Sequence, residues 1–397
     1  MRLRPAWLFA LLLLLAAGWW LRAEWLFIER YGSYLLGGYD AHTVPVDWFE
    51  PRAPLAHGDG WVPEPAAPPT IPRTLLDEVV AYADAQDSMA LIVLRHGRLE
   101  LEHYGPGYTR ESLFNPQSMA KTLVAMAVGI ALADGAFTSL DDPIGRYLDE
   151  WRDDPRGSIT VRNLLQMSGG LEQISTDYRP VPWSRAVWQH FGTDFNAPIL
   201  RLRLADPPGT RFDYNNNENN LLGLLLERAT GEPYQDYLGR RLWQPAGRAP
   251  AWMYLDRPGG NVMKSCCVFS RPVDWAVLGQ LLLDDGRLRG RQILPPGWAA
   301  EMRRPADSWP GYGYQLWLTT LLDGKTSPEP PPSVQAWWAS EPFASDDVFQ
   351  LAGHGFQHTW VIPSLDLVVL RASRTWPPAP WDQAKIPNLL IRGLRGD

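Results

Sequence analysis

The sequence predicts an α+β fold, in which an antiparallel sheet flanked by helices carries an inserted all-helical domain. Strand patterns lie near the beginning of the chain, over residues 90–102, and return near its end, over residues 360–370. Helical patterns dominate the middle of the chain, residues 116–254. A chain of 397 residues, of which 45% are hydrophobic, is long enough to bury the cores of two such domains.

The expected sheet domain begins with a helix and a hairpin. Apolar residues recur at helical spacing over residues 75–83, which predicts a helix that runs to about Gln86. Two strand-like runs, 90–94 and 99–102, then flank His96-Gly97, a pattern that is typical of a β-hairpin. The helix is therefore expected to cover one face of the sheet that the hairpin begins.

The end of the chain completes the expected sheet. Residues 360–362 and 367–370 have strand composition on either side of a turn, and a final helix is expected over residues 382–391. Together with the first hairpin, these strands would form one antiparallel sheet. The expected domains are residues 74–115 with 255–397 for the sheet domain, and residues 116–254 for the helical domain.

The N-terminal residues 1–28 are predicted to be a signal-anchor or a signal peptide. Arg2 and Arg4 precede an apolar run over residues 6–21, which is typical of both. Ala16-Ala17-Gly18 offers a cleavage site. The aromatic residues that follow suit the membrane interface of an uncleaved anchor, which is the interpretation we favour; they are Trp19, Trp20 and Trp25.

The order of charge along this segment predicts where the rest of the chain lies. Because the basic residues precede the apolar run, the bulk of the chain is expected on the extracytoplasmic, periplasmic side of the cytoplasmic membrane. The Pro-rich stretch that follows, residues 29–73, lacks apolar periodicity. It is predicted to be an extended linker.

Composition argues against several classes of partner. A formal net charge of -7 leaves no basic surface for phosphate backbones, so no nucleic-acid partner is expected and a small-molecule substrate is favoured. The 7 histidines and 2 cysteines show no spacing typical of a metal site, and neither a metal nor a cofactor is expected. The two cysteines, Cys266 and Cys267, are adjacent. No disulfide framework can be proposed from them, and we interpret them as buried small apolar side chains.

The first candidate for chemistry is the pair Ser118 and Lys121. In a helix, residues three apart share a face, so the hydroxyl and the amine can approach hydrogen-bonding distance. A buried lysine with a lowered pKa can then take the serine proton and activate the oxygen as a nucleophile. The N-H groups at a helix start favour a developing oxyanion. By itself the SxxK spacing is weak evidence, because it recurs by chance in many helices.

The second candidate is a loop that contains Tyr214 and Asn216 and precedes a predicted helix over residues 221–229. A phenol in this position can relay a proton between the serine and a leaving group. The amide can bind Lys121 or a substrate carbonyl. An Asn-rich turn that caps the helix would account for the same residues, so this loop does not indicate a site without the other elements.

The third candidate is the segment from Gly353 to His358, just before the strand at residues 360–362. Its glycines allow a ligand to lie close to the backbone, and an N-H on an edge strand can be a second oxyanion donor. A histidine of the core is the alternative interpretation of this segment.

In their order and separation, these three elements resemble the serine β-lactamase and penicillin-binding protein superfamily, whose SxxK, YxN and KTG-type boxes converge on one site. The resemblance covers residues 75–395 and includes residues 160–170, similar to a helix-to-loop segment of the family that ends in Ser-Gly. Residues 266–275 resemble the class C-related branch, which includes 6-aminohexanoate-dimer hydrolases and related esterases. The resemblance implies a β-lactamase/transpeptidase-like fold.

The resemblance also implies a role for each site residue. Ser118 would be the acylated nucleophile, Lys121 its base, and Tyr214 the proton shuttle for the leaving group and the deacylating water. Asn216 would position Lys121 and the substrate. The oxyanion hole would consist of the N-H groups of Ser118 and Gln357.

One departure from the family pattern narrows the expected substrate. The Lys and Thr of the KTG box help to bind a substrate carboxylate, whereas this chain has His354 and Gly355, which belong to the expected substrate-binding set. A histidine is mostly neutral at pH 7, and a glycine has no hydroxyl. We therefore expect a serine hydrolase for an ester or amide, with weak or absent β-lactamase and carboxypeptidase activity. The alternatives are a peptidoglycan-directed D,D-peptidase or β-lactamase, and a catalytically silent penicillin-recognising binding module.

Overall fold

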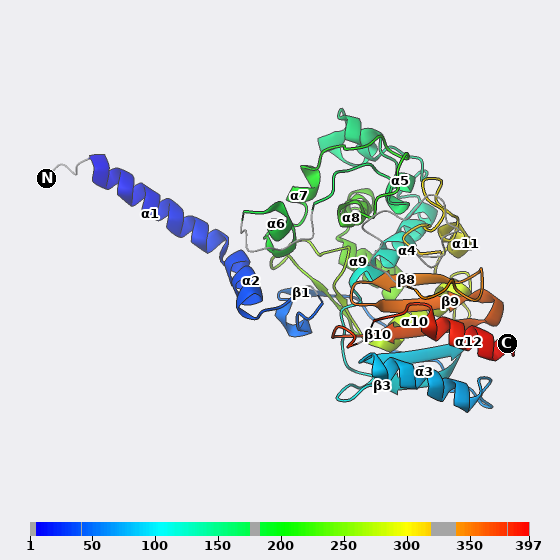
Figure 1. Cartoon of the computed structure of the whole chain (residues 1–397). Helices are drawn as coiled ribbons and strands as arrows, with labels where there is room; N and C mark the ends of the chain where they lie inside the picture. Colours follow the sequence, from blue (N-terminus) through cyan, green and yellow to red (C-terminus); the bar gives the residue numbers. More distant parts are fainter. Residues whose placement is uncertain (1–4, 41, 175–182, 319–338, 379, 397) are drawn as a thin grey trace.

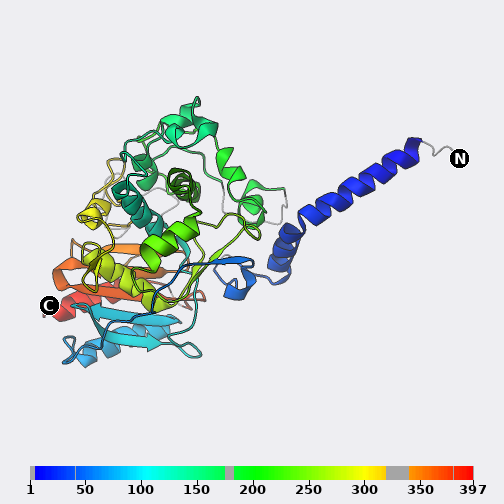
Figure 2. The same ribbon diagram turned by 180° about the vertical axis from the view of Figure 1, so that it is seen from behind.

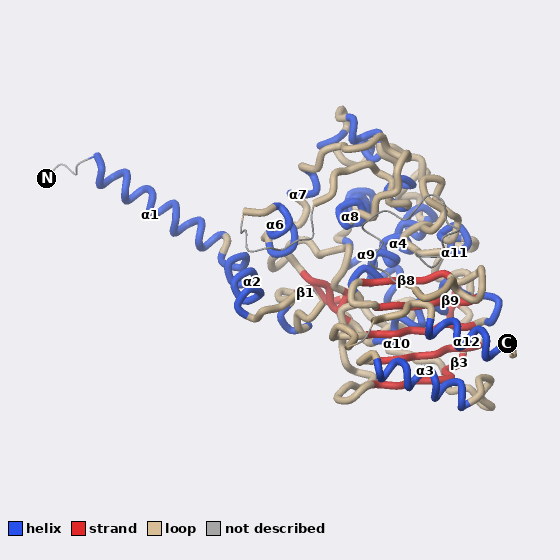
Figure 3. The backbone as a smooth tube through the Cα atoms, in the orientation of Figure 1, coloured by secondary structure: helices blue, strands red, loops and turns tan. Residues whose placement is uncertain are grey.

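A computed structural model describes residues 5–40, 42–174, 183–318, 339–378 and 380–396. Its main sheet has five antiparallel strands in the order β3-β2-β10-β9-β8 (Figures 1 and 3). The strands are β2 (Ala90–Arg95), β3 (Arg98–Tyr104), β8 (Phe349–Gly353), β9 (Gln357–Ile362) and β10 (Leu367–Ala372). Both ends of the chain thus build one antiparallel sheet, which confirms the α+β fold class.

Two helices cover one face of this sheet, and a third covers the other. On the first face, α3 (Arg73–Ala85) and α12 (Lys385–Arg395) pack over the side chains of Leu91 and Val93. On the opposite face, α10 (Pro272–Leu283) contacts β2, β9 and β10. Successive residues of a strand point to opposite faces of the sheet. An uninterrupted apolar strand such as β2 can therefore contribute side chains to the cores on both faces.

The helical region lies above the sheet in Figure 1 and centres on α4 (Ala120–Ala133) and α8 (Asn216–Thr230). Almost every side chain of α4 is buried, and α8 ends at Gly231, whose φ of +71° closes the helix as a left-handed cap. The shorter elements are α5 (Val161–Leu165), α6 (Arg185–Phe191), α7 (Ala197–Leu200), α9 (Tyr234–Leu238), α11 (Trp298–Met302), β1 (Arg52–Pro54), β4 (Trp252–Tyr254), β5 (Val268–Phe269), β6 (Arg287–Leu288) and β7 (Arg291–Gln292).

The N-terminus forms two helices with different surroundings. Helix α1 (Pro5–Ala23) extends away from the rest of the chain in Figures 1 and 2, and its apolar side chains, such as Leu14 and Trp19, are exposed. Helix α2 (Trp25–Leu36) instead packs on α6. By length and composition, no single described helix can cross a membrane, but α1 from Phe9 onward and α2 together meet that test, with a bend of 67° between them.

The segment that was expected to be an extended linker is packed against the sheet domain. Its first residues belong to α2, and β1 pairs with β4 in a second sheet of order β1-β4-β5. Leu55 and Ile71 are buried in the two largest apolar cores. Proline is tolerated here because β1 is an edge strand, where the missing N-H breaks no central ladder.

The structure also corrects the expectation that the two cysteines are small apolar side chains of the core. Cys266 and Cys267 are joined to each other by a disulfide, so they are not two separate small apolar side chains. Adjacent cysteines can bridge only in an uncommon backbone conformation, which the sequence did not reveal. Cys267 has such a conformation, with φ of +69°.

Candidate active site

Ser118 and Lys121 are in direct contact at the start of a buried helix. Ser118 lies in a short 3-10 turn (Gln117–Met119) that leads into α4, and its Oγ lies 2.6 Å from the Lys121 Nζ. Gln117, just before the serine, has φ of +53°, which is uncommon for a residue with a side chain. Such strained positions often occur at functional sites, where the surrounding structure maintains them.

The surroundings of Lys121 suit a base. Its side chain is 1% exposed, and burial lowers its pKa from 10.5 to about 7. Its Nζ donates to the carbonyl of Ser265 at 3.0 Å and lies 5.1 Å from the centre of the Tyr214 ring. Among the described residues, no carboxylate forms an ion pair with it. A large part of the amine is therefore neutral near pH 7 and can accept a proton.

Tyr214 completes a group of three polar side chains around the serine. Its hydroxyl lies beside the Ser118 side chain, close enough to influence the pKa of the phenol. Its ring packs beside Trp317 at 5.1 Å and Tyr312 at 6.1 Å between centroids. Burial in this aromatic surrounding raises the pKa of Tyr214 well above 10. The phenol thus keeps its proton at neutral pH and can donate a hydrogen bond, while Lys121 is the group able to accept the serine proton.

No hydrogen bond joins Asn216 to Lys121 in the part of the chain that the structure describes. Asn216 is the first residue of α8, and its Oδ1 is buried without a hydrogen-bond partner among the described residues. The polar group that binds Lys121, besides Ser118, is the Ser265 carbonyl. A buried amide oxygen without a partner is costly, so a donor from a bound molecule would be stabilised there.

The third candidate segment forms the turn between β8 and β9, directly against the serine turn. At Gly353, an added Cβ would lie 2.3 Å from the carbonyl oxygen of Pro116, so only glycine permits this approach. At Gly355, where φ is +75°, an added Cβ would lie 1.9 Å from the His42 ring. His42 therefore fills the space that a threonine side chain would need at position 355.

The backbone of β8 shows which N-H groups of this turn are available. Gln350 exchanges both its backbone hydrogen bonds with Trp317, at 2.8 and 3.0 Å, on the side away from β9. Because N-H groups of a strand alternate in direction, those of Ala352 and His354 point the same way, off the edge of the sheet. Gly353 pairs with Gln357 instead, and the Gln357 side chain is bonded to the backbone of Ser373. This geometry favours the N-H of His354, not that of Gln357, as a donor to a ligand.

Comparison with known proteins identifies the family. The Beta-lactamase family model matches residues 76–392. The chain belongs to the beta-lactamase family. The chain is similar to the 6-aminohexanoate-dimer hydrolase of Paenarthrobacter ureafaciens, with 25% identity over 348 residues that cover 82% of this chain and 83% of the relative. It is also similar to the esterase EstB of Burkholderia gladioli, with 29% identity over 180 residues, 39% of this chain and 44% of the relative.

Solved structures agree with the fold of this beta-lactamase-family chain. A structure from Bacillus anthracis that carries the same dimer-hydrolase name superposes with a TM-score of 0.70 at 17% identity, covering 90% of this chain and 93% of that one. EstCE1, a hydrolase with promiscuous acyltransferase activity, superposes with a TM-score of 0.58 at 17% identity, covering 81% and 98%. The family match and the relatives named hydrolase, esterase and beta-lactamase identify the chain as an enzyme of the serine-hydrolase type.

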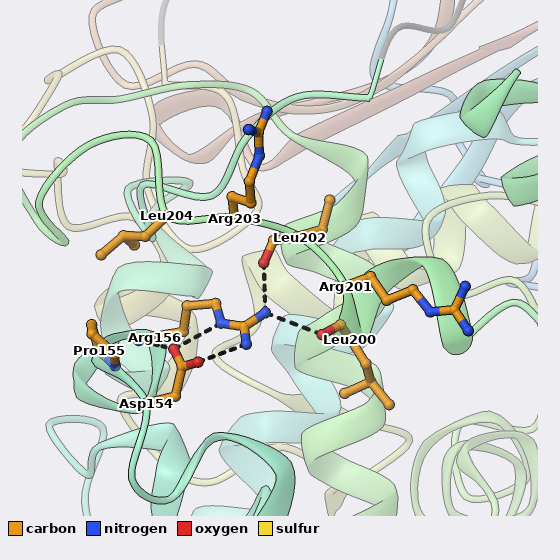
Figure 4. A pocket seen from close by; sticks show the side chains of 8 residues that line it. All are labelled: Asp154, Pro155, Arg156, Leu200, Arg201, Leu202, Arg203 and Leu204. Carbon is orange, nitrogen blue, oxygen red and sulfur yellow. Dashed lines mark hydrogen bonds and ion pairs between the residues drawn. The ribbon is translucent and has the colours of Figure 1, made fainter.

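A surface pocket elsewhere on the beta-lactamase-family chain does not carry comparable chemistry. It is lined by residues 154–156 and 200–204 (Figure 4). Its central Arg156 guanidinium is bonded to the Asp154 carboxylate and to the carbonyls of Leu200 and Leu202. The charge of Arg156 is thus already satisfied within the protein, and no nucleophile lines the pocket.

Two parts of the beta-lactamase-family site could not be found from the sequence. Tyr312 and Trp317, which enclose Tyr214, lie about a hundred residues after it. Their segment, residues 309–317, is rich in aromatic and glycine residues, but nothing in that pattern connects it with Tyr214. His42 comes from the segment that was expected to be a linker. Contacts between such distant segments depend on the tertiary fold.

Proposed function

We propose that the chain hydrolyses a small-molecule ester or amide through a covalent acyl-serine intermediate. The observation that carries this proposal is the 2.6 Å contact between the Ser118 Oγ and a buried Lys121 amine. The relatives that are named hydrolase and esterase are consistent with it. A silent binding module would not need a base with a lowered pKa beside its serine.

The proposed reaction has two halves, acylation and deacylation, and both halves use the same polar groups. Lys121 accepts the proton of Ser118, and the Oγ attacks the substrate carbonyl carbon to form a tetrahedral intermediate. The backbone N-H groups of Ser118 and His354 stabilise its oxyanion. When the bond to the leaving group breaks, the Tyr214 hydroxyl donates a proton to that group and is reprotonated from Lys121. Water then attacks the acyl carbon and passes a proton through Tyr214 to Lys121. The bond between the acyl carbon and the Ser118 oxygen breaks, and Lys121 returns the proton to that oxygen.

The surroundings of the serine favour an uncharged acyl group. The exposed His354 ring contacts Trp376 and His42, at 5.1 and 6.1 Å between centroids. Desolvation beside these rings lowers the pKa of His354, so the neutral imidazole dominates at pH 7. Burial also lowers the pKa of His42, to about 4. The third box therefore offers neither the cation nor the hydroxyl that would hold a carboxylate. The free Asn216 Oδ1 suits the N-H of an amide substrate.

This proposal predicts a specific result in a mass measurement. The full-length chain in detergent is mixed with p-nitrophenyl esters, an anilide amide and benzylpenicillin, and intact mass is recorded over time. We expect a transient acyl adduct and nitrophenol release with the esters, and no lasting penicillin adduct. A long-lived penicillin adduct would favour the peptidoglycan-directed alternative. A folded protein that neither acylates nor turns over any substrate would contradict the proposal.

We further propose that residues 1–28, which comprise α1 and the first turn of α2, anchor the chain in the cytoplasmic membrane with the catalytic domain on the extracytoplasmic side. The exposed apolar side chains of α1, such as Leu12 and Leu14, have no cover within the described structure. A disulfide such as Cys266–Cys267 persists in an oxidising compartment, which is consistent with this side.

The anchor can be tested by fractionation. We expect the full-length chain to sediment with membranes and to resist extraction by alkaline carbonate. Replacing Leu12 and Leu14 by Arg should release it, because each charge at the centre of a membrane helix costs about 3 kcal/mol. The matched control replaces Leu35 and Leu36 by Arg, which makes the same two changes at exposed positions of α2. Equal extraction of all variants would contradict the anchor.

A further inference from the structure

The disulfide lies in a segment that runs beside the catalytic turn. At one end of this segment, the carbonyl of Ser265 accepts a hydrogen bond from the Lys121 Nζ at 3.0 Å. At the other end, the carbonyl of Ser270 accepts from the backbone N-H of Phe114 at 3.1 Å. The Cys266–Cys267 bond lies between these two contacts. The backbone of the cysteines thus continues directly into Ser265, whose carbonyl contacts the proposed base and whose own N-H is bonded to the Asn220 Oδ1.

A second contact links the disulfide to the nucleophile. The backbone N-H of Cys267 donates to the Asn115 Oδ1 at 3.2 Å. The same oxygen accepts the N-H of Gln117, the residue before Ser118, at 3.0 Å. The Asn115 side chain thus connects Cys267 with the strained turn that presents the serine. Cys267 is 1% exposed, and Asn115 is half-buried.

The covalent bond explains why this backbone is stable. Cys267 has φ of +69°, a conformation that is disfavoured for any residue with a Cβ. A disulfide between neighbours closes a small ring that restricts the backbone of both residues. Two free thiols would leave the chain able to relax toward an extended conformation. Both the Ser265 carbonyl and the Cys267 N-H would then change direction.

We propose that Cys266 and Cys267 are positioning residues, whose disulfide holds the Ser265 carbonyl against Lys121 and the Asn115 amide against the turn of Ser118. This inference rests on the proposed function, because it concerns the same serine and lysine. Opening the disulfide is expected to reduce kcat, since small displacements of reacting groups are costly. It is also expected to shift the pH midpoint of activity downward, because loss of the carbonyl acceptor disfavours the protonated amine.

Reduction of the full-length enzyme in detergent tests this inference. A phosphine converts the disulfide to two thiols while it takes oxygen from water, and alkylation followed by intact mass shows that both thiols have formed. With a p-nitrophenyl ester, we expect kcat to fall by about tenfold, with little change in KM and a lower pH midpoint. Reoxidation should restore both values. The double variant Cys266→Ser/Cys267→Ser should resemble the reduced enzyme and not respond to the phosphine.

A rescue variant separates positioning from a general structural role. In Cys266→Ser/Cys267→Gly, glycine adopts a positive φ freely, so the backbone can keep its direction without the disulfide. We expect this variant to be several-fold more active than the double serine variant, with a pH midpoint nearer to that of the oxidised enzyme. Equal loss in both double variants, with no change in pH midpoint, would overturn the inference.

Two further outcomes distinguish this inference from the proposed function. If the oxidised enzyme acylates Ser118 but reduction leaves kcat and the pH midpoint unchanged, only the inference fails. The same holds if the isolated protein already carries two alkylatable thiols. If the oxidised enzyme never acylates, the proposed function fails and the inference fails with it.

Discussion

Replacing Ser118 by alanine is expected to abolish turnover and to remove every acyl adduct from the mass spectrum. The serine oxygen is the atom that would form the covalent bond, and loss of a nucleophile in enzymes of this kind lowers kcat by about 10⁴-fold to 10⁶-fold. The measurement is the release of nitrophenol under saturating ester, together with the intact mass of the same sample. Stability should hardly change, because only the contacts with Lys121 and Tyr214 are lost.

The control for this variant is Ser158→Ala, which removes an exposed hydroxyl that bonds only the nearby Pro155 carbonyl. Ser158→Ala should keep the full rate and the adduct. If Ser118→Ala still turned over the ester at a rate close to that of the unmodified chain, another nucleophile would have to act. The proposed assignment of Ser118 would then be wrong.

The lysine is expected to determine the pH dependence of the reaction. Because burial lowers its pKa to about 7, kcat/KM should rise with pH to a plateau, with a midpoint near 7. No decline from Tyr214 is expected below pH 10, since burial raises the pKa of that phenol. Lys121→Met should lower kcat by about 10³-fold or more and remove the rising part of the profile. A profile that kept its midpoint in this variant would contradict the assignment of Lys121.

The same substitution is expected to make the protein more stable at pH 7. The unfolded chain holds the lysine proton up to about pH 10.5, whereas the folded chain loses it near 7. Between pH 7 and pH 10.5 the unfolded state binds more protons than the folded state, so the free energy of unfolding rises with pH. At pH 7, nearly the whole cost of burying the lysine still lowers that free energy. Each pKa unit corresponds to about 1.4 kcal/mol. Lys121→Met should therefore raise the unfolding free energy most at low pH and less toward pH 10, as denaturant titrations would show.

The sequence was sufficient for the first hairpin of the sheet and the helix before it, because their signals are local. The periodicity of residues 75–83 and the hairpin around His96-Gly97 correspond to α3 and to strands β2 and β3. The segment before them gave no such signal. Prolines and irregular apolar residues in 39–73 look like a linker, although Leu55 and Ile71 are buried by contacts with distant parts of the chain. Tertiary packing therefore decides the structure of this segment.

The candidate site was predictable where spacing brings residues together. Ser118 and Lys121 are three apart in one helical turn, and their contact follows from that spacing. The partner of Lys121 was not predictable, because the Ser265 carbonyl comes from a loop 144 residues away. The direction of the N-H groups at the end of β8 was not predictable from the sequence either. The register of β8 with β9 determines which N-H groups point off the sheet, and a single sequence does not give that register. The N-H of Gln357 was therefore expected to be the second oxyanion donor, whereas the geometry favours the N-H of His354.

Arg30 determines where the chain can be shortened for expression. Its guanidinium donates to the carbonyls of Glu50, Leu255 and Asp256, and the apolar side chains beside it cover Phe191. A recombinant chain that began at residue 40 would leave these carbonyls without their donor and expose the aromatic surface beneath α2. A chain that began at Glu24 would keep this helix and omit the exposed apolar side chains of α1. The practical boundary for crystallisation or assay in plain buffer is therefore the break between the two N-terminal helices.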